Sequence, residues 1–235
     1  LVLGAAIVVA TEFVAIGLAR ALVELALSPA QVGFLVTVFA LASALLGPML
    51  VAVTAHFRPG PVLAAALLPF AASSVLIPFP SFAMAVVLRV LQGATLPLFM
   101  SLAGAQLAMT RGAGAGVALL YVGVTIGGTL APPARAFAAE RLGWKAPLAV
   151  LGAFALIAAA ACLQLSGSKP TDDRKTTWRL LARAPMWMHL LLSANLRGDF
   201  TGFSYIALLL GRAGLDPDAV ATALLGFGAA GLAGK

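Results

Sequence analysis

The fold of this chain is decided by stretches such as residues 146–165, which read APLAVLGAFALIAAAACLQL and contain no charged side chain. The hydrocarbon core of a bilayer is about 30 Å thick, so a helix of roughly 20 apolar residues spans it. Further runs of this kind follow one another along the 235 residues, separated by polar segments. The eight runs cover residues 1–20, 31–55, 61–79, 82–107, 113–135, 146–165, 185–210 and 217–235. The sequence therefore predicts an all-α, polytopic transmembrane helix bundle.

The overall composition supports the same prediction. Hydrophobic residues make up 62% of the chain and charged residues only 10%, a balance that a domain with a water-facing polar surface could hardly reach. The apolar runs are continuous and do not alternate as the strands of an outer-membrane barrel do. The net charge of +7 is spread over loops and helices without an aromatic-interleaved basic patch, so no nucleic acid is expected as a partner.

One long polar segment, residues 166–184, separates the sixth apolar run from the seventh. It holds the densest group of basic residues, and the positive-inside rule places such a group in the cytoplasm. Alternation from there also puts Arg58 and Arg111 inside, whereas three other basic residues fall outside. The chain is therefore expected to lie in the cell's inner (plasma) membrane with a cytoplasmic N-terminus.

The second and eighth runs begin with similar sequences. Ser28-Pro29-Ala30-Gln31-Val32 matches Asp216-Pro217-Asp218-Ala219-Val220, and the same register aligns Phe39 with Phe227. Similar short polar segments that recur at a fixed offset between apolar runs are typical of transporters built from internal repeats. Coincidence in a low-complexity apolar sequence is the alternative.

The first helices of the two expected units also correspond, since Glu12-Phe13 matches Asp199-Phe200 with one residue of slippage. The repeat predicts an N-terminal six-helix bundle at residues 1–165 and a cytoplasmic linker at residues 166–184. Residues 185–235 would be the first two helices of an incomplete C-terminal bundle. About eight of twelve helices would then be present, in a C-terminally truncated chain.

Four local patterns, taken in order, resemble one known family. They are Thr11-Glu12-Phe13-Val14 with Gly17-Leu18; Ser28 to Gly33 with Leu35-Val36-Thr37; Arg89-Val90-Leu91-Gln92-Gly93; and the stretch from Gly123 through Pro133 to Lys145. Together they resemble the major facilitator superfamily, specifically its drug/proton antiporter branch with the related sugar and arabinose efflux permeases. The resemblance implies a secondary active transporter that exports small molecules in exchange for protons by alternating access.

Two segments depart from the pattern of that family. The loop between helices two and three usually reads Asp-Arg-x-Gly-Arg, but here residues 54–60 read TAHFRPG, with no acid. The fifth-helix motif has Ala131, Pro132 and Arg135 where small residues or glycines are usual. An uncoupled facilitator or exchanger of a sugar or metabolite, or a non-transporting membrane fragment, therefore remains an alternative.

Charged residues within the apolar runs are the candidates for proton coupling. Burying Glu12 as an ion costs at least ~2.5 kcal/mol on insertion scales, so it should be functional or paired with a neighbouring helix. Asp199 lies equally deep in the seventh run, where Asn195 at i−4 shares its face. Arg89 lies about eight residues, roughly 12 Å, from Ser81, so it either snorkels to the headgroups or, as the resemblance implies, takes part in proton transfer.

Other residues are expected to bind substrate or to shape the bundle. Gln92, Asn195 and Tyr121 are predicted to contact substrate, and a preference for amphipathic small molecules is all that the sequence indicates about it. Gly93 and the GxxxG pairs Gly112–Gly116 and Gly123–Gly127 suit close helix contact in lipid. Pro132-Pro133 should kink or end the fifth helix, and Pro133 is predicted to belong to a gate.

The sequence gives no support to an enzyme. It has no Ser-His-Asp, Cys-His or paired-carboxylate arrangement, and a lipid-acting membrane enzyme would need a cluster of His, Asp or metal ligands at one face. His56 and His189 lie on different segments without further ligands at metal spacing, so neither a metal nor a cofactor is expected. Cys162 should be a small packed residue. The predicted partners are a small-molecule substrate, protons and the lipid bilayer, with the full-length protein a monomer.

Overall fold

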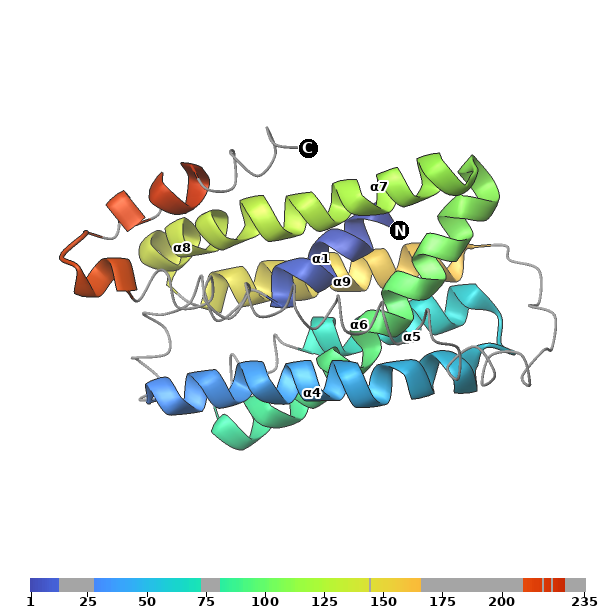
Figure 1. Cartoon of the computed structure of the whole chain (residues 1–235), viewed down its shortest axis with the longest axis horizontal. Helices are drawn as coiled ribbons and strands as arrows, with labels where there is room; N and C mark the ends of the chain where they lie inside the picture. Colours follow the sequence, from blue (N-terminus) through green and yellow to red (C-terminus); the bar gives the residue numbers. More distant parts are fainter. Residues whose placement is uncertain are drawn as a thin grey trace, which may run out of the picture.

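The computed structural model of the chain describes residues 1–12, 28–72, 81–143, 145–165, 209–216, 218–220 and 222–226. Throughout these ranges the regular secondary structure is helical, and Figure 1 shows long helices lying side by side. The helices of residues 1–165 are α1 (Val2–Glu12), α4 (Pro29–Thr54), α5 (Pro59–Ala71), α6 (Phe82–Arg111), α7 (Ala113–Thr125), the π-helix η2 (Ile126–Leu130), α8 (Ala131–Leu142) and α9 (Lys145–Leu163), and further helical residues lie within 209–226.

These helices follow the first six predicted runs in order, although the fourth and fifth helices extend beyond the predicted ends at residues 107 and 135. In the described part of the chain, four stretches are long and apolar enough to cross a bilayer, and they are Ala30–Thr54, Phe82–Arg111, Ala113–Ala134 and Lys145–Leu163. The helices α1 and α5 are also apolar but shorter over the residues described. The predicted all-α, polytopic bundle is confirmed, whereas the predicted linker 166–184 and most of residues 185–235 lie outside the described residues.

The two segments proposed as repeats have the same local geometry at their helix starts. The Ser28 hydroxyl accepts a hydrogen bond from the Gln31 backbone N–H at 3.2 Å, and the Gln31 side chain accepts one from the Ser28 N–H. The Asp216 carboxylate likewise accepts from the Ala219 N–H at 2.7 Å. Both are N-caps that satisfy a backbone donor of the first helical turn. The matched motifs therefore perform the same structural task, and the division into two units stays a prediction.

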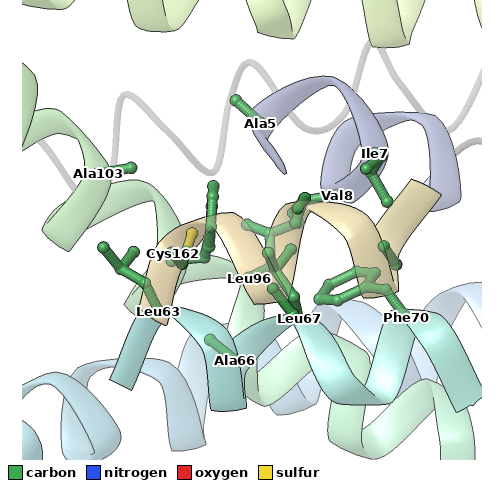
Figure 2. Close-up of a cluster of buried hydrophobic side chains, with 14 of the residues drawn as sticks. Ala5, Ile7, Val8, Leu63, Ala66, Leu67, Phe70, Leu96, Ala103 and Cys162 are labelled. Carbon is green, nitrogen blue, oxygen red and sulfur yellow. The ribbon is translucent and has the colours of Figure 1, made fainter. Parts of the chain in front are cut away.

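The hydrophobic core lies around α5, in contact with α1, α6 and α9. Leu63, Leu67 and Phe70 of α5 are at most 1% exposed, and Figure 2 shows them between the ribbons of neighbouring helices. Cys162 of α9 is buried in the same cluster, which confirms its prediction as a small packed residue. The outer faces carry large exposed apolar side chains such as Phe154, as expected where the surroundings are lipid.

Glycines bring α1 into backbone contact with the fifth helix. A Cβ atom at Gly123 would lie 2.4 Å from the Val2 carbonyl oxygen, and one at Gly127 would lie 2.3 Å from the Ala6 carbonyl oxygen. No side chain fits at such distances, so the approach of α1 to α7 and η2 depends on glycine at both positions.

The expectation for Gly112 was wrong. Gly112 lies between α6 and α7 with φ = 85°, and a Cβ there would meet nothing within 4 Å. Its role is to end α6, because only glycine adopts this backbone conformation without strain. The fourth predicted run therefore extends to Arg111, and the tight turn places Gly116 against the backbone of Ala108.

The fifth helix does not end at Pro132-Pro133, as one form of the prediction had it. The chain stays helical through α7, η2 and α8 as far as Leu142, and both prolines are buried. Each proline lacks an N–H, and its ring collides with the carbonyl four residues earlier in a regular α-helix. The wider π turn η2 lies directly before the prolines and is the segment in which this conflict is accommodated.

The glycine contacts make a testable prediction about stability. Gly127→Ala should destabilise the protein by about 1–3 kcal/mol, because the new methyl group overlaps the Ala6 carbonyl. The matched control is Gly114→Ala, where a Cβ meets nothing within 4 Å, and it should be neutral or stabilising by up to about 1 kcal/mol. Thermal unfolding in detergent measures both, and equal midpoints for the two variants would contradict the packing described here.

Candidate functional site

Arg89 lies inside the bundle, on α6. Its side chain is only 7% exposed, and its Nη1 donates a hydrogen bond to the Thr11 carbonyl oxygen of α1 at 2.9 Å. The alternative that Arg89 snorkels to the headgroups is therefore wrong, because the guanidinium points to a neighbouring helix. A charged hydrogen bond inside an apolar bundle ties α6 to the end of α1.

Glu12 follows Thr11 at the last described residue of α1. It is partly buried, and its negative charge attracts the Arg89 guanidinium. Thr11 is 2% exposed and its hydroxyl donates to the Ile7 carbonyl at 2.8 Å within the same helix. The structure thus brings together two residues predicted for proton coupling, which lie 77 positions apart in the sequence.

Helix α4 also contacts the Arg89 side chain. The Arg89 Cζ atom lies 5.4 Å from the centroid of the Phe39 ring, within the range of a cation–π interaction. Phe39 is buried, as is Ser43 one turn later on α4. At Gly93 of α6, a Cβ atom would lie 2.3 Å from the Phe39 carbonyl oxygen, so the two helices touch through their backbones there.

Gln92 connects α6 to α5. It is 3% exposed, and its Nε2 donates to the Pro69 carbonyl oxygen at 3.2 Å. Tyr121 is 54% exposed on α7 and so lies at the surface of the described helices, outside the buried cluster. Asn195 and Asp199 lie outside the described residues. Of the predicted substrate contacts, the described residues Gln92 and Tyr121 thus differ in their surroundings, and the role of all three stays a prediction.

Pro133, Gly123 and Gly127 occupy the neighbouring part of the fifth helix. The two glycines contact α1 as described above, and Pro133 is buried just after η2. The structure therefore places three of the predicted gating and packing residues in one continuous helix that packs against α1.

The described residues offer no group of three or more His, Cys, Asp or Glu side chains that could hold a metal ion. His56 lies in the turn after α4, where the centroid of its ring is 4.0 Å from the centroid of the Phe57 ring. His189 is outside the described ranges.

Two partners of Arg89 were missed by the sequence reasoning. Thr11 acts through its backbone carbonyl, which no side-chain pattern reveals. Phe39 is one of 13 phenylalanines, and its only distinguishing signal was its alignment with Phe227. Neither residue carries a charge, so a search for charges in apolar runs does not find them.

The fold and the site define a polytopic helical membrane protein that keeps a paired cation and acid inside an apolar bundle. The sequence model of the Major Facilitator Superfamily matches residues 1–235, and the chain belongs to this family. The family consists of transporters, so the protein is a membrane transporter whose contacts include lipid and a small-molecule substrate. A search among curated proteins gave no match.

The Arg89 cluster makes a prediction about energetic coupling. Removing the cation by Arg89→Ala takes the charged donor away from the buried Thr11 carbonyl and from the Glu12 charge, and leaving a buried acceptor without its partner costs about 1–3 kcal/mol. In the double variant Arg89→Ala/Glu12→Gln, position 12 carries no charge either. The combined loss in the free energy of unfolding should therefore be smaller than the sum of the losses in the two single variants. Unfolding in detergent should give a coupling energy of about 1–3 kcal/mol.

The conservative variant Arg89→Lys is the control, because it keeps the charge but loses the planar guanidinium. It should fall between the wild type and Arg89→Ala. Strict additivity of the two single variants would show that Arg89 and Glu12 do not interact.

Proposed function

We propose that the protein is a secondary active transporter of the drug/proton antiporter type, which exports small molecules such as drugs, sugars or metabolites in exchange for protons. The observation that carries the proposal is the buried Arg89 guanidinium, hydrogen-bonded to Thr11 and attracted by Glu12. Charges inside a transmembrane bundle are costly and typically mark ion or substrate pathways.

Glu12 is the proposed proton carrier. When it is ionised, its charge balances that of Arg89; when it takes up a proton, Arg89 keeps the Thr11 carbonyl and the Phe39 ring as its partners among the described residues. Protonation therefore changes the force that holds α1 to α6. A ligand shifts a conformational equilibrium only through such a difference between states, and here the ligand is the proton.

Movement of α1 would be transmitted to the fifth helix. Gly123 and Gly127 hold α1 against α7 and η2, and the π turn with Pro133 supplies a point where hydrogen bonding within the helix is already irregular. We propose these residues and Gly93 as the packing and gating elements of alternating access. Asp199 would act in the second unit as Glu12 acts in the first.

The proposed substrate contacts are Gln92, Asn195 and Tyr121. We also propose that the protein lies in the inner membrane and that the full-length protein is a monomer. The acid-free loop at residues 54–60 favours a second candidate, an uncoupled facilitator or exchanger. The two functions differ in whether a proton gradient drives accumulation.

The proposal predicts that Glu12→Gln abolishes gradient-driven transport. The full-length protein is assayed in inverted vesicles energised by respiration, with ethidium as an amphipathic cation and radiolabelled arabinose as a sugar. Accumulation of the transported probe should fall at least about tenfold in Glu12→Gln, because an amide cannot exchange a proton at neutral pH. Glu12→Asp, which keeps a titratable group, is the matched control and should retain part of the activity.

Unchanged accumulation in Glu12→Gln would remove Glu12 from the coupling mechanism. If an uncoupler leaves wild-type uptake of the probe unaltered, the protein is a facilitator and the coupled function is wrong.

A further inference from the structure

One partner of the Arg89 guanidinium, the Phe39 ring, carries no charge. The guanidinium is nearly excluded from the surface, and it donates a hydrogen bond to a backbone carbonyl, that of Thr11. The centroid of the Phe39 ring of α4 lies 5.4 Å from Arg89 Cζ, and Phe39 is itself 4% exposed. A desolvated cation over a phenylalanine face is attracted by the negative face of the ring.

The backbone of α6 fixes where that ring lies. Arg89 and Gly93 are four residues apart and so lie on one face of the helix. At Gly93 the backbone of α6 reaches the Phe39 carbonyl, and one turn earlier Arg89 reaches the Phe39 ring. A second close contact, of Gly47 in α4 with Pro97 in α6, keeps the same two helices together further along.

Within the part of the chain that the structure describes, few other charges lie on the helices around Arg89. The helices that pack against α6 are α1, α4, α5 and α7. Over their described residues α4 and α5 contain no charged side chain, α7 contains the titratable but exposed Tyr121, and α1 contributes Glu12 as its acid. On α6 itself the other basic residue, Arg111, lies in the last turn, six turns away. Like the Thr11 carbonyl, the Phe39 ring is a partner of Arg89 that neither takes up nor releases a proton, and it is the one of the two contributed by a side chain.

We infer that Phe39 is a positioning residue, whose ring face holds the Arg89 guanidinium beside Glu12 and so controls how readily Glu12 takes up a proton. The inference rests on the proposed function in treating Glu12 as the proton carrier, and it adds a component that carries no charge. The Phe39 ring keeps Arg89 in place in both protonation states of Glu12.

The test measures the protonation of Glu12 directly. The hydrophobic reagent N,N′-dicyclohexylcarbodiimide reacts with protonated carboxyl groups in membranes, and peptide mass spectrometry of the full-length protein quantifies labelling of Glu12 at neutral pH. Position 39 is filled in turn with phenylalanine, monofluorinated and trifluorinated phenylalanine, and leucine. Fluorine withdraws electron density from the ring face while leaving its size nearly unchanged, so the series varies the cation–π attraction with little change in packing.

Labelling of Glu12 should increase stepwise with fluorination. A guanidinium that is less firmly held stabilises the carboxylate less, which leaves more of the reactive protonated form. Phe39→Leu should give the highest labelling, about tenfold above the wild type, because it removes the ring altogether. Trifluorinated phenylalanine at Phe70, a ring that is equally buried in the core, is the matched control and should leave labelling at the wild-type level.

Equal labelling across the series at position 39 would overturn the inference. Increased labelling in Phe39→Leu alone, with the fluorinated residues unchanged, would overturn it too, because the ring would then act only by filling space. If Phe39→Leu does not fold, the fluorinated residues decide the outcome alone. Labelling needs neither substrate nor gradient, so its result is separate from that of the transport assay on Glu12→Gln.

Discussion

A guanidinium can be kept in an apolar bundle only where the protein replaces the water that it loses. Arg89 obtains these replacements from two neighbouring helices: the Thr11 carbonyl and the Glu12 charge from α1, and the Phe39 ring from α4. Each partner has a fixed place only if the helices lie at fixed distances from one another. The burial of the Arg89 guanidinium therefore depends on how α1, α4 and α6 are arranged. Gly93 contributes to this arrangement because it lets α4 and α6 touch.

The first helix is held from two sides. On one side Arg89 binds the carbonyl of Thr11, near the end of its described part; on the other, Gly123 and Gly127 admit its backbone into contact with α7 and η2. A change in the charge of Glu12 acts on the first contact and leaves the second intact. In the proposed mechanism, a proton on Glu12 would therefore change the position of α1 without loosening the bundle, and the irregular turn η2 lies in the helix that α1 contacts.

The sequence predicted the helices well because their limits are set by local chemistry. Uninterrupted apolar runs require helices in lipid, and the helix predicted over residues 31–55 is observed as α4, which begins two residues earlier because Ser28 caps it. The path of the chain through Pro132-Pro133 was not predictable from the prolines alone, since a π turn can absorb the conflict they create. The partners of Arg89 were hidden for a different reason. They are a backbone oxygen and an uncharged ring. Residues 11 and 39 each meet residue 89 in the folded bundle, and no periodicity of the sequence encodes these contacts.

The central claim is that Glu12 binds and releases a proton beside Arg89. Infrared difference spectroscopy of the reconstituted full-length protein, acidic minus neutral, measures this through the C=O stretching band of a protonated carboxylic acid. The account predicts a positive band in the wild type that is missing in Glu12→Gln and moves in frequency in Arg89→Lys, because the hydrogen bonding and field around the carboxyl change. Identical difference spectra for the wild type and Glu12→Gln would contradict it.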